Sequence, residues 1–437
     1  MKAVILDSPF HVSVREVPTP TVQSLQPGEA LVKVSLAGLC GSDLHVYRGA
    51  EPVAPGKVIL GHEMVGTVVA YNSGVSEASG SGSELTPNVR VGSAVLAPFT
   101  TSCGECEFCR DGFTARCIRS RLFGCETLAG AQAEFVVVPD AKGSLVTLDH
   151  LNHDPNAAPF HLHSALLCCD ILPTGYFAVM QALLHPNLYG ALRGTSLLDT
   201  LWSASASTEM SVSASSNDTS LTFAIVGLGP VGTCALISLL DILLHPTQPP
   251  LRLPDASSIV PRKLHILLID GVASRREAAQ RIVATIRKTH DRTFFTHARI
   301  DTLDIPEAES LATTGVVAAH AVLEVVGSND ALRLGYALLR PFGVLASVGV
   351  HTSALFPLTG DDLYNKNVAL AFGRCPVRGV LPLALRTLAR RQDVFARVAS
   401  EDRDGVGLID RIVSVDEAAE MYKLFEERKL GKVLFRM

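Results

Sequence analysis

The stretch Leu221–Leu244 reads LTFAIVGLGPVGTCALISLLDILL and decides how the second half of the chain folds. It holds a single charged side chain, Asp241, so by hydropathy alone it resembles a membrane-spanning helix. Three glycines and a proline interrupt its first half, which suits a strand, a turn and a helix better than one continuous helix. We therefore predict a buried strand that leads into a buried helix, and no membrane span.

The turn in this stretch follows the pattern G-x-G-x-x-G. It consists of Gly227, Gly229 and Gly232, with Pro230 and Val231 between the last two glycines. Glycines at these positions permit a tight turn and let the backbone approach a pyrophosphate at the N-terminus of the helix. Because a strand precedes the motif and a helix follows it, a dinucleotide site is favoured over a glycine-rich turn that binds nothing.

The next expected strand, KLHILLID, ends at Asp270, where an acidic side chain can accept hydrogen bonds from the adenine ribose. Asp270 lies further beyond Gly232 than the usual distance of about 20 residues. The segment His245–Arg262, which is rich in proline and serine, accounts for the excess. A carboxylate repels a 2′-phosphate, so we predict NAD rather than NADP, although Arg275 and Arg276 work against that preference.

Outward from this motif, the chain divides into two kinds of pattern. Its 437 residues exceed what one hydrophobic core normally serves, so two domains are expected. The first ~170 residues show short strands between Gly, Pro and Ser turns, as in a β-barrel or β-sandwich. From Gly175 onward, buried strands alternate with helical patterns, which indicates a parallel, doubly wound sheet. The predicted fold class is therefore α/β with a second, β-rich domain.

Composition narrows the partners and the compartment. A net charge of −5 and a pI near 6.3 give no electrostatic case for nucleic acid or an anionic membrane. The N-terminal residues MKAVILDSPFHVSV lack the apolar run of a signal peptide, so a reducing, cytoplasmic location is expected. Residues 74–88, 195–220 and 245–262 are rich in Ser, Pro and Gly and are predicted to be flexible surface insertions.

Four cysteines cluster in CGECEFCRDGFTARC with the spacing C-x2-C-x2-C-x7-C: Cys103, Cys106, Cys109 and Cys117. Four thiolates this close can wrap one tetrahedral Zn²⁺ and leave no open coordination position. A bacterial ferredoxin run has three residues before its last cysteine, so that alternative does not fit. Four unliganded thiols on a loop are the other alternative. We favour a structural zinc site that stabilises a loop and performs no chemistry.

A second set of reactive side chains lies in GLCGSDLHVYRG and ILGHEMVGTV: Cys40, Ser42, His45, His62 and Glu63. Each of them alone is more often a packing residue or an ordinary polar group. Together they supply a thiolate, an imidazole, a hydroxyl and a carboxylate, which are the groups found around a catalytic zinc.

The chain resembles the zinc-containing medium-chain alcohol dehydrogenase family because it carries, in this order, the run Cys40–His45, GHEMVG, the four-cysteine lobe and GLGPVG. CCDILPTGY and YNKNVALAFGRCPVR are similar to its formaldehyde-dehydrogenase-like branch. The resemblance implies a GroES-like β catalytic domain over residues 1–173, a Rossmann domain over 174–375 and a return to the catalytic domain over 376–437. It also implies a homo-oligomer, a dimer or tetramer, formed through the edge of the Rossmann sheet.

The resemblance also assigns roles. Cys40 and His62 would bind the catalytic zinc, and the third ligand, four residues before Thr174, would be Asp170. Many relatives carry Cys at that position, and Cys168 and Cys169 are adjacent, but the register favours Asp170. Glu63 would lie behind the metal or bind it intermittently.

Ser42 would take the alcohol proton and His45 would pass it to solvent. His351 is treated as an ordinary loop histidine. The predicted activity is zinc-dependent hydride transfer between an alcohol or hydrated aldehyde and NAD, with the substrate between the domains. A polyol or amino-alcohol dehydrogenase, or a non-catalytic dinucleotide-binding protein with scaffold zinc, are the alternatives.

Overall fold

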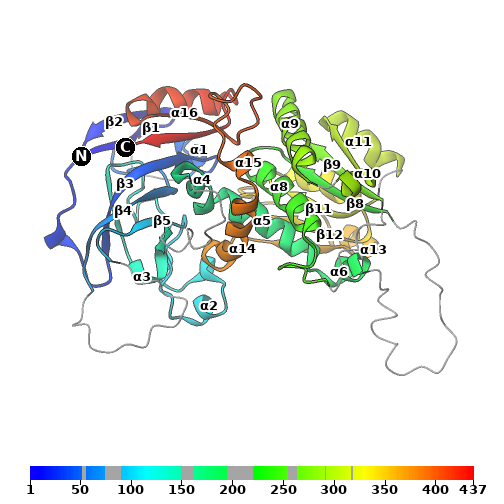
Figure 1. Ribbon diagram of the computed structural model, residues 1–437, viewed down its shortest axis with the longest axis horizontal. Coiled ribbons are helices and arrows are strands. Elements are labelled where there is room, and N and C mark those ends of the chain that lie inside the picture. Colours follow the sequence, from blue (N-terminus) through cyan, green and yellow to red (C-terminus); the bar gives the residue numbers. More distant parts are fainter. Residues whose placement is uncertain are drawn as a thin grey trace. The chain divides into compact units, whose positions relative to one another are not determined.

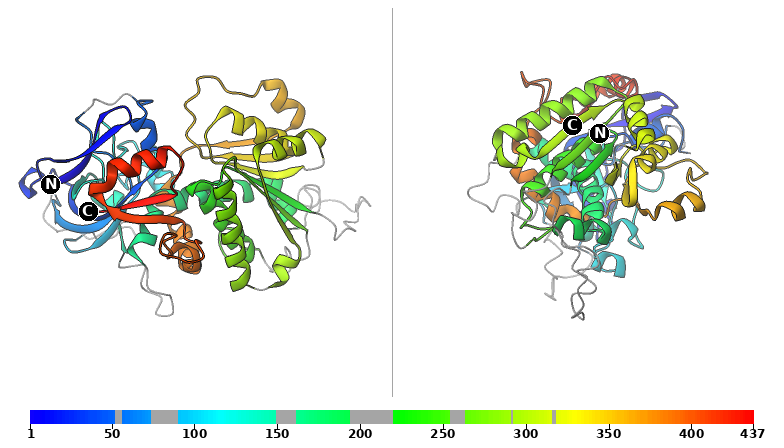
Figure 2. Two further views of the ribbon diagram at one scale, coloured as in Figure 1. Left: turned by 90° about the horizontal axis from the view of Figure 1, so that it is seen from above. Right: turned by 90° about the vertical axis from the view of Figure 1, so that its right-hand side faces the viewer.

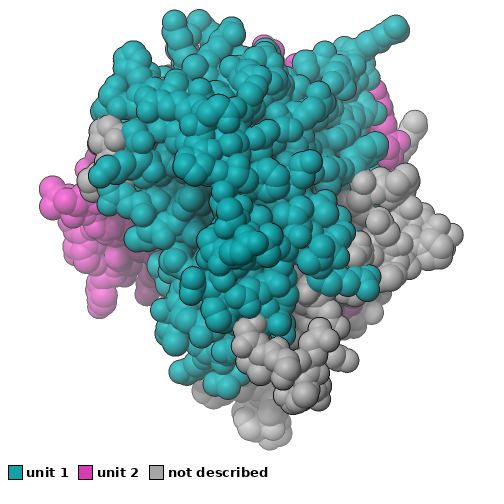
Figure 3. Space-filling model, turned by 90° about the vertical axis from the view of Figure 1, so that its left-hand side faces the viewer, with its two compact units in different colours: residues 1–173, 375–437 teal, residues 174–374 magenta. Residues whose placement is uncertain are grey.

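The computed structural model describes residues 1–51, 56–73, 90–148, 161–193, 220–253, 263–290, 292–315 and 318–437. The chain forms two compact units: Met1–Pro173 with Cys375–Met437, and Thr174–Arg374 (Figure 3). The expected insertion at 74–88 lies outside the described residues, as do 195–219 and 254–262 of the other two.

The first unit is built on a mostly antiparallel sheet with the strand order β14-β15-β3-β4-β5-β7, and β6 pairs with β3 (Figure 1). Its strands are β3 (Ala30–Leu39), β4 (Met64–Tyr71), β5 (Ala94–Ala97), β6 (Phe135–Val138), β7 (Val146–Thr147), β14 (Ile409–Ser414) and β15 (Lys432–Arg436). A hairpin of β1 (Lys2–Ser8) and β2 (His11–Glu16) stands beside this sheet. The sequence therefore yields the β-rich unit that its short, turn-separated strands predict.

The C-terminal strand β15 pairs antiparallel with β3, so Val433 faces Leu39. This pairing carries the end of the chain to the strand that leads into Cys40. The unit's short helices are α1 (Asp43–Tyr47), α2 (Glu107–Arg110), α3 (Ala141–Ser144), α4 (Leu162–Leu166), α14 (Val377–Arg390), α15 (Gln392–Phe395) and α16 (Ala418–Glu426). Its 3₁₀ turns are η1 (Val22–Ser24), η2 (Thr114–Arg116), η4 (Leu167–Cys169) and η6 (Val415–Glu417). Helix α5 (Ile171–Leu183) begins in this unit and continues into the second.

The second unit contains a six-stranded sheet in the order β10-β9-β8-β11-β12-β13, with every neighbouring pair parallel. Its strands are β8 (Leu221–Val226), β9 (Leu264–Ile269), β10 (Ala298–Leu303), β11 (Ala319–Glu324), β12 (Leu339–Ser347) and β13 (Ala369–Phe372). Counted from β8, this is the order 3-2-1-4-5-6 of the Rossmann fold, in which ligands bind where the order reverses, between β8 and β11. The predicted α/β fold class is confirmed.

Helices connect these strands and flank the sheet (Figure 2). Helix α8 lies beside α9, and α11 lies beside α12. The helices of this unit are α6 (Pro186–Arg193), α8 (Pro230–Leu244), α9 (Ala273–Thr289), α10 (Arg292–Thr296), α11 (Ile305–Thr314), α12 (Asn329–Leu338) and α13 (Gly360–Lys366).

The stretch 221–244 forms the predicted strand, turn and helix. Every residue of β8 is buried, and most of α8 is buried too. Among the described residues, no single helix is long and apolar enough to cross a membrane, and one bent pair, Leu162–Cys169 with Ile171–Leu183, meets only the length and composition criteria.

One expectation fails within the third predicted insertion. Residues 245–253 are described, and Leu251 and Leu253 are 1% and 3% exposed. The Tyr189 hydroxyl donates a hydrogen bond of 3.0 Å to the Leu251 carbonyl. The prediction of an exposed flexible loop is therefore wrong for this part. The prediction rested on the many prolines in this segment, but its two leucines provide apolar side chains that become buried.

Candidate active site and metal centres

Four predicted site residues converge in the first unit. Cys40 follows β3, His62 and Glu63 precede β4, and Asp170 separates η4 from α5. One ligand atom from each of them lies within 4.8 Å of the others, and the side chains are almost wholly buried. The adjacent antiparallel strands β3 and β4 bring Cys40 beside His62 and Glu63, and a hydrogen bond from Cys169 to the Met64 carbonyl brings Asp170 to the same point.

The donor atoms of this cluster suit a metal ion. Sγ of Cys40 is 3.5 Å and Nε2 of His62 is 3.4 Å from Oδ2 of Asp170. Within the described part of the chain, Nε2 of His62 is buried without a hydrogen-bond partner. A buried polar atom normally has a partner, and sulfur, imidazole and carboxylate donors are those that Zn²⁺ takes in catalytic sites.

Asp43 fixes the orientation of two of these side chains, and the sequence analysis assigned it no role. Its Oδ1 is 3.1 Å from Nδ1 of His62, and its Oδ2 accepts a 2.9 Å hydrogen bond from the backbone N–H of Cys40. A carboxylate on Nδ1 holds the proton there and leaves Nε2 as the metal-binding nitrogen. The signal was the position of Asp43, three residues after Cys40 at the start of α1.

Behind His62, Glu63 forms a buried ion pair with Lys432 of β15, and neither side chain is exposed. Burial lowers the pKa of Lys432, but the Glu63 carboxylate raises it further, so the ammonium pKa lies above its ordinary value. The second carboxylate oxygen, Oε1, has no hydrogen-bond partner among the described residues. A Cβ on Gly38 would lie 1.9 Å from the paired oxygen, so the strand needs glycine there.

The two cysteines beside Asp170, Cys168 and Cys169, were the alternative third ligands. Sγ of Cys169 donates to the carbonyl of Met64 at 3.1 Å, and burial raises the pKa of this thiol. Neither Cys168 nor Cys169 belongs to the group of ligand atoms around Cys40. The geometry therefore brings Asp170, and not its neighbours, to the cluster.

Ser42 and His45 lie on α1, close to the cluster in sequence. Ser42 occupies the N-cap position and His45 follows three residues later, a spacing that places both on one face of a helix. Both side chains are partly exposed. Among the described hydrogen bonds, the one between them joins the His45 backbone N–H to the Ser42 carbonyl, at 3.1 Å.

The four-cysteine lobe forms a second cluster in the same unit. The sulfur atoms of Cys103, Cys106, Cys109 and Cys117 all lie within 4.8 Å of one another. Backbone N–H groups of Cys103 and Arg119 donate to Sγ of Cys117, at 3.2 and 3.4 Å. N–H donors stabilise thiolates, and four sulfurs at this separation fit a closed tetrahedral zinc site.

In the second unit, the glycine-rich turn has the geometry that its sequence requires. Gly227 has φ +99°, and a Cβ on Gly232 would lie 1.9 Å from the Gly227 carbonyl oxygen. Gly229 is the N-cap of α8 and Pro230 is its first residue, with Val231 following in the first turn. The first turn of α8 thus presents backbone N–H groups at the carboxyl end of β8, where the strand order reverses.

Asp270 stands at the carboxyl end of β9, next to this turn. Its two oxygens accept hydrogen bonds from the backbone N–H groups of Leu228, at 2.7 Å, and Val272, at 2.8 Å. Nη1 of Arg275 is 3.6 Å from Oδ2, and Arg276 donates to the Asp270 carbonyl oxygen. The acid and both arginines therefore lie together, as their spacing suggested.

A further polar network at the carboxyl ends of β11 and β12 was not predicted. Ser347 donates to Oε2 of Glu324 at 2.6 Å, and Nε2 of His351 is 2.8 Å from the Ser347 hydroxyl. The other oxygen of Glu324 accepts from the N–H of Gly327 at 2.7 Å. His351 was treated as a loop residue, but it is part of a network that fixes two strand ends. Its sequence signal was only a position after an apolar strand.

Comparison with known proteins agrees with this architecture. Residues 26–149 match the alcohol dehydrogenase GroES-like domain. The chain is 35% identical, over all of its length and 81% of the relative, to zinc-type alcohol dehydrogenase B of Aspergillus flavus. A glutathione-independent formaldehyde dehydrogenase of Pseudomonas aeruginosa is 30% identical over 43% of this chain and 46% of that enzyme.

The structure of alcohol dehydrogenase TADH from Thermus sp. ATN1 superimposes with a TM-score of 0.70 at 26% identity, covering all of both chains. The chain therefore belongs to the zinc-type alcohol dehydrogenase family of medium-chain dehydrogenases and is an oxidoreductase.

Proposed function

We propose that this protein is a zinc- and NAD-dependent dehydrogenase of alcohols or hydrated aldehydes. The observation that carries the proposal is the convergence of Cys40, His62 and Asp170 around a buried imidazole nitrogen that makes no hydrogen bond among the described residues. Asp43 contacts Nδ1 on the other side of the His62 ring, which leaves the buried Nε2 available to bind a metal ion. Membership of the family supports the same reading.

Cys40, His62 and Asp170 would hold the catalytic zinc, and the four-cysteine lobe would hold the structural one. Zinc held by these three residues would polarise an alcohol oxygen and lower its pKa. Glu63 lies beside the three ligands, with one carboxylate oxygen within 4.8 Å of their donor atoms, and it forms an ion pair with Lys432. We assign it the role of an intermittent ligand.

The proton of the alcohol leaves through residues of α1. Ser42 follows Cys40 by two residues and would accept the proton on its hydroxyl. His45, one helical turn further and partly exposed, would pass the proton to solvent. The structure supports this relay through the shared helix face and the exposure of both side chains.

NAD would bind at the carboxyl ends of β8 and β9. The backbone of Gly227, Gly229 and Gly232 would receive the pyrophosphate, with Pro230 and Val231 in the first turn of α8. Asp270 would accept from the adenine ribose, and its carboxylate disfavours a 2′-phosphate. NAD bound there would supply the nicotinamide that accepts a hydride.

The substrate class is a small alcohol or hydrated aldehyde. A polyol or amino alcohol remains the alternative within the family, and the partial match to a formaldehyde dehydrogenase supports testing hydrated formaldehyde. We further propose a cytoplasmic homo-oligomer. Four of the cysteines lie in one cluster that suits a metal ion, which is typical of a reducing compartment.

Two measurements on the purified full-length chain test the proposal. NADH formation is followed over primary alcohols, polyols, amino alcohols and hydrated formaldehyde. Zinc per chain is counted by elemental analysis, with two ions expected. A protein that binds NADH and zinc but oxidises no member of the panel would be the non-catalytic scaffold instead.

A further inference from the structure

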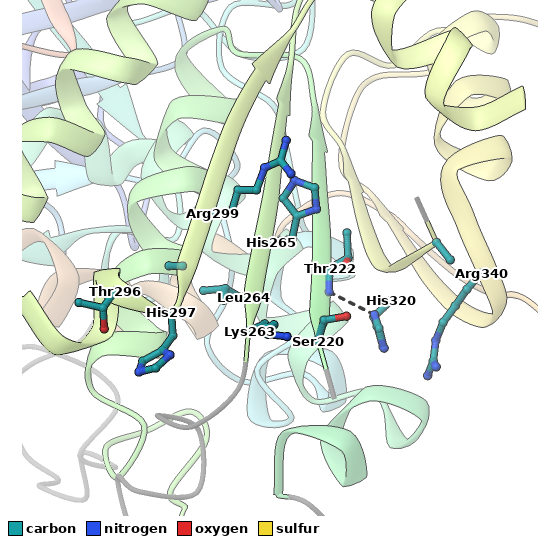
Figure 4. A pocket seen from close by; sticks show the side chains of 12 residues that line it. Ser220, Thr222, Lys263, Leu264, His265, Thr296, His297, Arg299, His320 and Arg340 are labelled. Carbon is teal, nitrogen blue, oxygen red and sulfur yellow. Dashed lines mark hydrogen bonds between the residues drawn. The ribbon is translucent and has the colours of Figure 1, made fainter. Parts of the chain in front are cut away.

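A cavity of about 760 Å³ opens at the amino ends of the strands in the second unit (Figure 4). Its lining residues are Ser220, Thr222, Lys263, Leu264, His265, Thr296, His297, Ala298, Arg299, Ala318, His320 and Arg340. They lie at or next to the first residues of β8, β9, β10, β11 and β12. The proposed coenzyme site is at the carboxyl ends of these strands, about 20 Å away along a six-residue strand.

Part of the lining forms one row across the sheet. Arg299 pairs in register with His265, and His265 pairs with Thr222. The Thr222 backbone N–H donates to Nδ1 of His320 at 3.2 Å, which continues the row to β11. Arg340 follows Leu339, the register partner of Ala319, and extends the row to β12. Figure 4 shows the side chains in this sequence, from Arg299 to Arg340.

The row is cationic and incompletely neutralised. None of the twelve lining residues is acidic. Asp301 forms an ion pair with Arg299, with 2.7 Å between Oδ2 and Nε, and the same oxygen is 2.8 Å from Nε2 of His265, so it balances one end of the row. At the other end, Nε of Arg340 is buried without a hydrogen-bond partner among the described residues. A buried guanidinium donor that lacks a partner is costly unless an acceptor completes it.

We propose that this cavity is a second binding site, separate from the coenzyme site, for a small molecule that carries two or more phosphate groups. Arginines suit phosphate because their donors form a planar fork that engages two oxygens at once. Five adjacent strands span about 19 Å, which is too wide for one phosphate ion to engage both ends. The volume falls within the range of small-molecule sites.

The ring state of His320 fits a donor role in this site. Its Nδ1 accepts a backbone hydrogen bond, so the proton of the neutral ring is on Nε2. Thr222 and Ser220 add hydroxyl groups that can donate to phosphate oxygens. The row thus carries the guanidinium of Arg340 at one end and that of Arg299, beside Asp301, at the other, with imidazole and hydroxyl groups between them.

The test uses the full-length protein saturated with NADH, so that phosphates cannot enter the glycine-rich turn. Binding of inositol hexakisphosphate and of inorganic phosphate is measured by titration calorimetry at constant ionic strength. The cavity variant is the double substitution Arg299→Gln with Arg340→Gln. The control, Arg333→Gln with Arg386→Gln, changes the net charge equally at two exposed arginines outside the cavity. Retained NADH binding shows that each variant is folded.

The wild type and the control variant are expected to bind inositol hexakisphosphate at one site per chain, and far more tightly than inorganic phosphate. The cavity variant should lose about tenfold in affinity for each arginine removed. Two results would overturn the proposal. One is the absence of binding to the wild type with NADH present. The other is an equal loss in the cavity and control variants, which would show a nonspecific charge effect.

Discussion

Oδ1 of Asp43 lies 3.1 Å from Nδ1 of His62, while its other oxygen accepts from the backbone N–H of Cys40. One carboxylate therefore positions both an imidazole and the backbone of a thiolate residue. Neither of the two atoms it contacts is expected to bind zinc directly. Asp43 is a positioning residue, and its effect should appear in metal affinity before it appears in stability.

The variant Asp43→Asn tests this role. An amide can accept at only one oxygen, so either His62 or Cys40 loses its partner. We expect zinc affinity of the catalytic site to fall by about 10- to 100-fold, the range for residues that orient metal ligands. Zinc retained against a competing chelator gives the measurement. Asp330→Asn, at an exposed position, is the control, and equal retention in both variants would contradict the assignment.

The Glu63–Lys432 pair makes a prediction about stability. Lys432→Met leaves a fully buried carboxylate without its ion-pair partner, which typically costs about 3–5 kcal/mol. The double variant Lys432→Met with Glu63→Gln removes both charges and should recover most of the loss. Denaturant unfolding of the four proteins in this cycle gives the coupling. Additive losses in the double variant would show that the pair contributes little.

The same pair shows where sequence reasoning reached its limit. Glu63 and Lys432 are 369 positions apart, and only the pairing of β15 with β3 brings them together. Asp43 was also missed, because a carboxylate at the start of a helix is usually solvated, and its position three residues after Cys40 was the only signal. A close approach between distant segments depends on strand register, which a single sequence specifies poorly across a long chain.

What could be predicted had a local physical cause. The stretch 221–244 specifies its own turn, because only glycine tolerates φ +99° at Gly227 and the close approach at Gly232. The four-cysteine lobe needs only its own fifteen residues to bring four sulfurs together. The buried leucines at Leu251 and Leu253 were missed because proline and glutamine around them resemble a surface loop.

The identity of the third catalytic ligand can be decided by counting zinc. Asp170→Ala should reduce zinc from two ions per chain to one, because a carboxylate oxygen is lost from the cluster. Cys169→Ser should retain both ions, since its side chain bonds to Met64 rather than to the cluster. Asp170→Cys should keep two ions with a lower kcat, because a second thiolate makes zinc a weaker Lewis acid. Loss of zinc in Cys169→Ser, with Asp170→Ala unaffected, would reverse the assignment.

The structural zinc should be lost in acid. Hydrogen bonds from backbone N–H groups, with that of Ile118 the largest effect, lower the pKa of Cys106 to about 6. The pKa of Cys106 is lower in the folded protein than in the unfolded chain, so the thiolate stabilises the folded state above its unfolded pKa. This stabilisation is lost as the pH falls through about 6. Protons then compete with the metal.

Zinc release into a colorimetric chelator, measured against pH in the Asp170→Ala background, isolates the four-cysteine lobe. Release should increase as the pH falls and move to higher pH in Cys106→Ser. Cys125→Ser, which alters a cysteine outside the lobe, should follow the parent curve. A parent protein that loses zinc already above pH 7 would disprove the stabilisation of the thiolate.

Coenzyme choice should depend on the balance between Asp270 and its two arginines. Asp270→Asn removes the charge that repels a 2′-phosphate. It also makes Arg275, which is 3.6 Å from the Asp270 carboxylate in the wild type, available to a phosphate. We expect the ratio of kcat/KM for NADP to that for NAD to rise about tenfold or more. Arg275→Gln should lower the same ratio, because it removes a phosphate donor while the acid remains. If both substitutions move the ratio in the same direction, the adenine ribose does not lie at Asp270 and the coenzyme is held by the glycine-rich turn alone.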